Sequence, residues 1–109
     1  MLIENLAFCI TDWNEVPSTK HAGETGSATR KTRQFGNIRV RFVEYTPDYL
    51  ADHWCSRGHI LLVLEGELGT ELKDGRKFFL RPGMTYQVAT DADPHRSYTK
   101  TGAKLFIVD

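Results

Sequence analysis

A chain of 109 residues has room for one domain, and its 14 basic and 14 acidic side chains leave no net charge. Because nucleic acids and anionic membranes are bound by basic faces, this balance argues against both partners. No stretch approaches the ~20 apolar residues of a membrane span, and the first residues do not resemble a signal peptide. We therefore expect a cytoplasmic protein, in which Cys9 and Cys55 act as thiols or ligands rather than as a disulfide.

Residues 1–36 form the least regular part of the chain. The apolar runs at 2–3 and 7–10 are candidates for a short strand, whereas residues 11–26 are rich in Pro, Ser, Gly and Thr and predict a loop. His21 and Glu24 are interpreted as exposed residues of this loop. A chain this short buries a limited fraction of its surface, so we expect this segment to supply edge strands and to pack on, or exchange with, the neighbour in a homodimer.

From residue 37 to residue 109 the pattern becomes typical of β-structure. Residues 38–45 alternate, with Ile38, Val40 and Phe42 on one face and Arg39, Arg41 and Val43 on the other. The Asp-Gly and Pro-Gly pairs indicate tight turns between short strands. We predict an all-β, single-domain antiparallel barrel of the jelly-roll type over residues 37–109. Further strands are predicted at 58–64, 67–72, 78–80, 86–89, 95–99 and 104–108.

Potential metal ligands concentrate just before the apolar strand at 58–64. His53, Cys55 and His59 lie within seven positions, and His95 follows after a further hairpin and a Pro-Gly turn. On an extended strand His53 and Cys55 point to the same face, and His59 stays in phase unless Gly58 introduces a bulge. We predict that His53, Cys55, His59 and His95 bind one divalent transition metal ion, such as Zn²⁺, Ni²⁺ or Fe²⁺, because imidazoles and a thiolate suit these ions better than Mg²⁺ or Ca²⁺. The alternatives are hydrogen-bonded interior histidines without a metal and a Cys55 that is only a small buried hydrophobe.

The spacing of these residues resembles the first motif of the cupin superfamily, G-x5-H-x-H-x3,4-E-x6-G. His53 matches its first histidine, Cys55 stands at the second histidine, His59 stands at the glutamate, and Gly66 ends the motif. The resemblance implies a cupin barrel with a metal site inside it. Loss of the motif glutamate removes the carboxylate that many oxygen-activating cupins supply.

The second cupin motif is matched in part, and a smaller family is also indicated. His95 matches the histidine of this motif, but Thr99 takes the place of its asparagine and the preceding P-x-G is missing. The segment 51–59, Ala-Asp-His-Trp-Cys-Ser-Arg-Gly-His, resembles the signature of the small DHCW-motif cupins. This likeness implies a single cupin domain of uncharacterised activity.

Several residues near these motifs have competing interpretations. Asp52 is interpreted as a turn residue or as a carboxylate that orients a histidine. Trp54 and Tyr98 are interpreted as core or interface aromatics, with a wall of a binding site as the alternative. The basic residues between 30 and 41 are expected on solvated strand faces. An inward position, where a guanidinium would bind an anionic molecule, is the alternative for three arginines: Arg39, Arg41 and Arg96.

Three functions are compatible with this sequence. The first is a metal-dependent enzyme that acts on a small polar metabolite at an open position of the ion. The second is a non-catalytic sensor that binds a small molecule or a metal in a closed site of three histidines and Cys55. The third is a metal-free barrel that serves as an interaction domain. The partner expected for the first two is a small polar or anionic molecule, and no residue is assigned a catalytic role.

Overall fold

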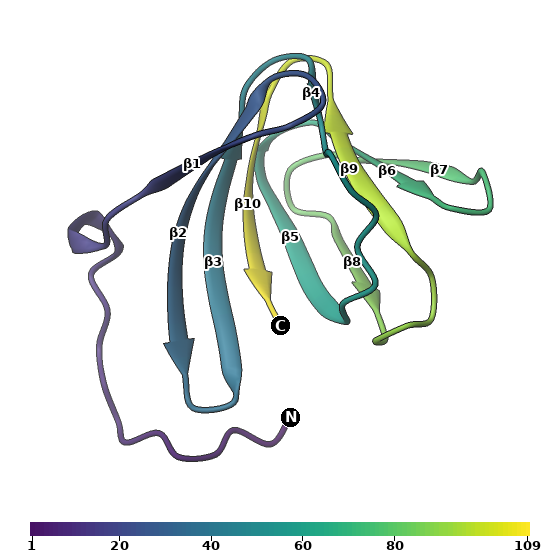
Figure 1. Ribbon diagram of the computed structural model, residues 1–109. Coiled ribbons are helices and arrows are strands. Elements are labelled where there is room, and N and C mark those ends of the chain that lie inside the picture. Colours follow the sequence, from purple (N-terminus) through teal and green to yellow (C-terminus); the bar gives the residue numbers. More distant parts are fainter.

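A computed structural model describes residues 1–109 as two facing antiparallel sheets (Figure 1). A single turn of 3-10 helix, η1 (Trp13–Glu15), precedes the strands. No helix in the chain has the length and apolarity needed to cross a membrane. The strands are β1 (Thr19–Ala22), β2 (Ser27–Phe35), β3 (Ile38–Tyr45), β4 (Tyr49–Leu50), β5 (His59–Gly66), β6 (Leu68–Leu72), β7 (Lys77–Leu80), β8 (Thr85–Val88), β9 (His95–Thr99) and β10 (Ala103–Val108).

The larger sheet has the order β1-β2-β3-β10-β5-β8, and the smaller one has the order β4-β9-β6-β7. The chain crosses between the sheets after β3, β4, β5, β7, β8 and β9, so consecutive strands often lie in opposite layers. This arrangement confirms the predicted all-β jelly-roll fold. The β6–β7 hairpin turns at Gly75, whose φ of 101° suits the Asp-Gly turn expected there.

The core lies between the two sheets and follows the alternation of the strands. In β5, Leu61 and Val63 are buried and their neighbours face outward, and in β10 Leu105 and Ile107 are buried in the same way. Leu68 of β6 closes this core from the other sheet. Burial of each such side chain stabilises the fold by roughly 1.5–3 kcal/mol, which explains why the barrel forms around these strands.

Residues 1–26 differ from the prediction in two ways. No strand forms within residues 1–12, which pass below the larger sheet before η1 (Figure 1). The apolar runs there have no strand to pair with, and Phe8 and Ile10 are 94% and 87% exposed. The predicted loop at 11–26 contains β1, which pairs with β2 at the edge of the larger sheet. All residues of β1 are exposed, and its sequence does not alternate between apolar and polar residues. The strand therefore could not be predicted from the local sequence pattern.

Candidate metal centre

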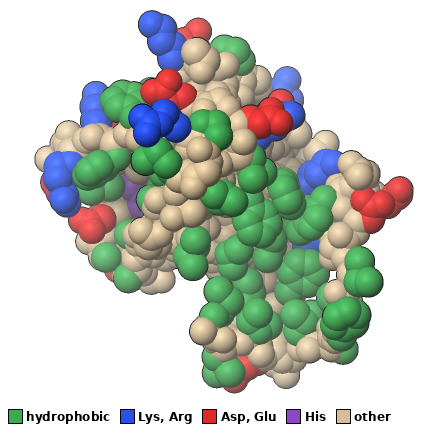
Figure 2. Space-filling view, turned by 180° about the vertical axis from the view of Figure 1, so that it is seen from behind, with side chains coloured by type: hydrophobic (Ala, Val, Ile, Leu, Met, Phe, Trp, Pro, Cys, Tyr) green, Lys and Arg blue, Asp and Glu red, His purple; other side chains and the backbone are tan.

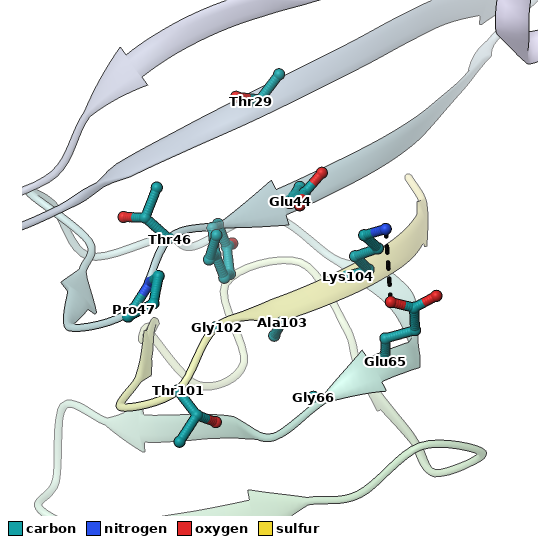
Figure 3. A pocket seen from close by; sticks show the side chains of 11 residues that line it. Thr29, Glu44, Thr46, Pro47, Glu65, Gly66, Thr101, Gly102, Ala103 and Lys104 are labelled. Atoms are coloured by element: carbon teal, nitrogen blue, oxygen red, sulfur yellow. Dashed lines mark ion pairs between the residues drawn. The ribbon is translucent and has the colours of Figure 1, made fainter.

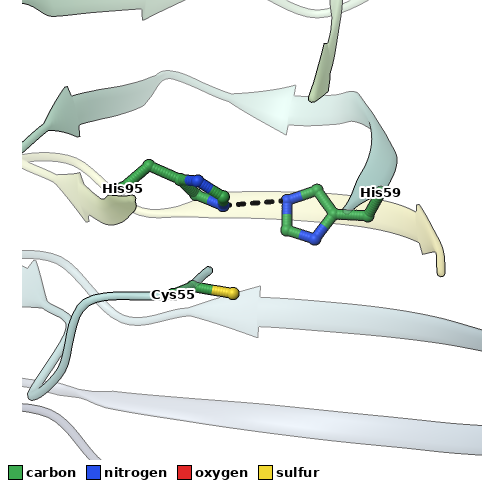
Figure 4. Close-up of side chains that lie close together, drawn as sticks. All are labelled: Cys55, His59 and His95. Atoms are coloured by element: carbon green, nitrogen blue, oxygen red, sulfur yellow. Dashed lines mark hydrogen bonds between the residues drawn. The ribbon is translucent and has the colours of Figure 1, made fainter. Parts of the chain in front are cut away.

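Backbone hydrogen bonds place Cys55 beside His95. The two residues form an isolated antiparallel bridge, in which the Cys55 N–H donates to the His95 carbonyl at 2.7 Å and the His95 N–H donates to the Cys55 carbonyl at 3.0 Å. His95 begins β9 in the smaller sheet, whereas His59 begins β5 in the larger sheet. Their side chains meet between the sheets (Figure 4), where ligand atoms of Cys55, His59 and His95 all lie within 4.8 Å of one another.

Both histidines present their Nε2 atoms to this cluster. His95 donates its Nδ1–H to the backbone carbonyl of Asp93 at 2.8 Å, which orients the ring so that Nε2 faces the cluster. The Nε2 atoms of His95 and His59 are 3.2 Å apart, and His59 Nε2 also lies 2.8 Å from the hydroxyl of Tyr86. A metal ion would take the place of the weak contact between the two rings.

The cluster also favours the metal-binding protonation states of two of its members, His59 and Cys55. Burial, followed by the nearby His95, lowers the pKa of His59 to about 4, so this imidazole is neutral at physiological pH. A hydrogen bond from His95 lowers the pKa of Cys55, and the same bond raises the pKa of His95. The Cys55 Sγ also accepts a hydrogen bond from the backbone N–H of Arg57 at 3.4 Å. The thiolate, which is the form that binds metals, is therefore stabilised in the metal-free protein.

Because the thiolate is stabilised, Cys55 should be alkylated at a lower pH than an ordinary thiol. The measurement uses a Cys9→Ser variant, which leaves Cys55 as the remaining thiol. The rate of its alkylation by iodoacetamide, followed as a function of pH, should have its midpoint below the ordinary thiol pKa of about 8.5. The sign follows from the lowered pKa, since the reactive thiolate then persists to lower pH. Replacement of His95 by alanine should move the midpoint upward. A midpoint at or above that of a free thiol would contradict the hydrogen bond between Cys55 and His95.

His53 lies at the edge of the cluster. Its side chain lines the same cavity as Cys55, His59 and His95, but it is 64% exposed and its Nδ1 lies 2.7 Å from an Asp52 carboxylate oxygen. The segment 51–58 is irregular apart from the bridge at Cys55, so the two-residue phase of a strand does not hold there. Asp52 orients His53 in the way that the sequence indicated, and the role of His53 as a ligand stays a prediction.

A buried carboxylate that the sequence analysis missed stands behind His59. The Asp109 side chain is completely buried; Arg39 donates to its two oxygens at 2.8 Å each, and Arg41 donates to one of them at 3.1 Å. Arg57 lies 3.4 Å away, and the nearest carboxylate oxygen is 3.9 Å from His59 Nδ1. Burial opposes ionisation, but the arginines hold the pKa of Asp109 below its ordinary value. The expectation that Arg39 and Arg41 lie on a solvated face is therefore wrong.

The clustered ligands line a cavity of ≈ 70 Å³ between the sheets. Its remaining wall includes Tyr45, Tyr49 and Tyr86 rather than the aromatics suggested by the sequence. Trp54 lies under the Arg96 guanidinium, 4.5 Å from it, and Tyr98 packs against a β7 side chain, so neither ring lines this cavity.

A larger hollow of ≈ 510 Å³ lies elsewhere, around the start of β10 (Figure 3). It is lined mainly by polar and glycine residues, among them Glu65 and Lys104, which form an ion pair at 3.5 Å. No histidine or cysteine lines this hollow. Although this hollow is larger than the cavity at Cys55, it lacks the side chains that bind transition metals, so it is not a candidate metal site.

Comparison with known proteins identifies the architecture. No protein-family model matches the sequence, and no curated protein sequence matches it. Among solved structures, the Fe(II) form of HppE aligns with 95% of this chain and 62% of its own, with a TM-score of 0.78 and 21% identity. A cupin-2 domain containing protein from Shewanella frigidimarina aligns over 73% of this chain and 78% of its own, with a TM-score of 0.60 and 17% identity.

The protein has a cupin fold. Ectoine synthase from P. lautus shares it, with a TM-score of 0.72 and 16% identity over 93% of this chain and 76% of that chain. The chain spans less than two thirds of the length of HppE, so the similarity concerns the barrel alone. Within this cupin fold the motif residues Cys55, His59 and His95 come together inside the barrel.

Proposed function

We propose that this small cupin binds a divalent transition metal ion through Cys55, His59 and His95, with His53 as a further ligand. The observation that carries the proposal is that ligand atoms of the first three residues, drawn from both sheets, lie within 4.8 Å of one another. His53 is proposed as a further ligand because it lines the same cavity. Imidazole and thiolate ligands favour Zn²⁺, Ni²⁺ or Fe²⁺ over Mg²⁺ and Ca²⁺.

The proposed ion would supply a Lewis acid to a small polar or anionic molecule in the cavity. The chain itself contributes the surroundings of that molecule. Tyr86 stays a neutral hydroxyl because burial raises its pKa, and it is hydrogen-bonded to His59. Asp109 stands on the Nδ1 side of the same ring, 3.9 Å away, so it places negative charge beside the ring without a hydrogen bond to it. Whether the site is catalytic or a closed sensor site depends on His53, because a fourth protein ligand would complete a tetrahedron.

Metal uptake tests this proposal directly. Protein purified without chelators should contain one transition ion per chain by elemental analysis. Co²⁺ added to the metal-free protein should give a thiolate charge-transfer band, because Cys55 supplies a sulfur ligand. A Cys55→Ser variant should lose this band, whereas a Cys9→Ser variant should keep it, since Cys9 is exposed and outside the cluster. Absence of uptake by the unmodified protein would leave the metal-free interaction domain as the better function.

We further propose that the chain is a DHCW-motif cupin and acts in the cytoplasm. Support for the family comes from the segment 51–59, in which the histidine and cysteine of the signature both line the cavity. The free thiols of Cys9 and Cys55 support a reducing compartment.

We propose a homodimer as the working assembly. Figure 2 shows hydrophobic side chains gathered over a broad area of one face of the molecule. Large apolar side chains of the N-terminal residues are exposed, among them Leu2 at 71% and Phe8 at 94%, and so are outward-facing residues of β5, such as Ile60 at 47%. Exposed apolar side chains do not stabilise a monomer. In a dimer, the N-terminal segment of each chain would cover apolar side chains of the other chain.

Light scattering at micromolar concentration should therefore give about twice the 12.4 kDa of one chain. A Phe8→Asp, Ile10→Asp variant should shift toward the monomer mass, because charges would enter the proposed contact. Phe79→Asp is the matched control, since Phe79 is 61% exposed on β7, in the other sheet. A monomer mass for the unmodified protein would contradict the proposal.

A further inference from the structure

Arginine side chains form part of the cavity wall beside the metal ligands. Arg30, Arg41 and Arg96 all line it, together with Cys55 and His59. Arg96 is neutralised by Glu71: its Nε–H donates a hydrogen bond to one carboxylate oxygen at 3.0 Å, and its terminal nitrogen lies 2.8 Å from the same oxygen in an ion pair. Arg30 and Arg41, in contrast, each have a buried N–H group without a hydrogen-bond acceptor.

Arg30 makes no ion pair with a carboxylate; its guanidinium is hydrogen-bonded to the side chain of Tyr49, and its buried Nε–H has no hydrogen-bond acceptor. Arg41 shares the single carboxylate of Asp109 with Arg39 and Arg57, and its own Nε–H is also buried without an acceptor. A buried guanidinium donor without a partner costs free energy, so two of them facing one cavity need an explanation. An anionic ligand would supply the missing acceptors.

The β-register places these two guanidiniums so that they can act on the same group. Arg30 of β2 pairs with Val43 of β3, and Arg41 lies two residues before Val43 on the same strand. The arginines are therefore diagonal neighbours on the inner face, within reach of each other's side chains. A planar carboxylate or phosphate matches the hydrogen-bonding fork of a guanidinium.

The phenols of Tyr45 and Tyr49 complete this wall. Their rings stack with centroids 4.1 Å apart. Burial raises the pKa of both, that of Tyr49 to about 12, so neither carries negative charge that would repel an anion. The small volume of the cavity, ≈ 70 Å³, selects a small organic acid over a nucleotide or a sugar phosphate.

We propose that Arg30 and Arg41 form an anion subsite that binds the carboxylate of a small organic acid. The inference deepens the proposed function and rests on it in one respect: a second oxygen of the acid would then face the metal held by Cys55, His59 and His95. The arginines themselves belong to the chain, so carboxylate binding does not require the ion.

The test is a ligand-detected NMR titration with pyruvate and with its neutral ester, methyl pyruvate. It is carried out on the metal-free protein and on the Zn²⁺-loaded protein. The variants are Arg30→Met and, as the matched control, Arg33→Met, because Arg33 is an exposed residue of the same strand. Circular dichroism and elemental analysis of each variant report whether the fold and the metal are kept.

Pyruvate is expected to bind the unmodified protein and Arg33→Met, and to bind Arg30→Met about tenfold more weakly or worse, since a charged hydrogen-bonded contact is lost. Methyl pyruvate should bind weakly to all of them. Equal binding of pyruvate to both variants, or equal binding of the ester and the acid, would overturn the subsite. Should Arg30→Met fail to fold, Arg30→Lys keeps the charge without the fork, and wild-type affinity in that variant would also overturn it.

The titration separates this inference from the proposed metal function. Metal uptake without any binding of pyruvate refutes the anion subsite alone. Pyruvate binding that depends on Arg30 in a protein that takes up no metal supports the subsite and refutes the metal function. Metal content that is unchanged in Arg30→Met, together with lost pyruvate binding, supports both.

Discussion

Replacement of His95 by alanine is expected to weaken metal binding by about 100-fold or more, because loss of a residue that only orients a ligand already costs 10–100-fold. His95 contributes its own Nε2 and also stabilises the Cys55 thiolate through a hydrogen bond. The substitution thus removes one ligand and raises the pKa of another. His59→Ala should have a comparable effect, since it removes the ligand supplied by the larger sheet.

The measurement is a competition titration against a chelator, with metal stoichiometry determined after dialysis. His21→Ala is the matched control, because His21 is exposed on β1 and outside the cluster. His53→Ala decides the remaining question about the site. A loss similar to that of His95→Ala would make His53 a fourth ligand, whereas unchanged affinity would leave the ion with an open position. Full metal content in both His59→Ala and His95→Ala would refute the proposed site.

Gly66→Ala is expected to destabilise the fold by about 3 kcal/mol. Gly66 ends β5 with a φ of 77°, a conformation that residues with a Cβ adopt at a cost of about 1–2 kcal/mol. An added Cβ would also collide with the backbone carbonyl of Gly102 and lie 2.9 Å from the Cα of Ala103. Neither backbone atom can move without breaking the pairing of β5 with β10.

Urea unfolding measures this effect, and Gly83→Ala provides the control. Gly83 has a similar φ of 87°, but a Cβ there would meet no atom within 4 Å. The control should therefore lose only about 1–2 kcal/mol, the cost of the backbone conformation. An equal loss of unfolding free energy in the two variants would contradict the prediction, because the backbone of β10 would then accommodate the added Cβ without destabilising the fold.

The strands predicted from residue 37 onward were found because their signals are local. Alternation over 38–45 and the Asp-Gly turn are visible without knowledge of the partner strands. β2 and β4 lacked such signals. β2 contains many Thr, Arg and Lys side chains and forms by pairing along its length with β3. β4 has only two residues, which pair with the end of β9.

The cavity shows the same division between local and long-range information. The cysteine and the histidines were found because family-like spacing and metal-ligand chemistry can be read from the residues alone. Asp109 was missed because its contact with Arg39 depends on the register of β10 against β3. Arg30 was assigned to a solvated face because charge alone does not show which face of a strand is enclosed. Register decides this, and register depends on strands that are distant in the sequence.

The ligands of the proposed ion are divided between the two layers of the barrel, with His59 on one side and both Cys55 and His95 on the other. The geometry offered to an ion therefore depends on how the layers are spaced and twisted. That spacing is set by the packed side chains between them, including Leu61, Leu68 and Leu105. Because close-packed interiors transmit small shifts, core substitutions distant from the ligands could change which metal is preferred while the fold remains intact. Metal selectivity would then be a property of the whole core.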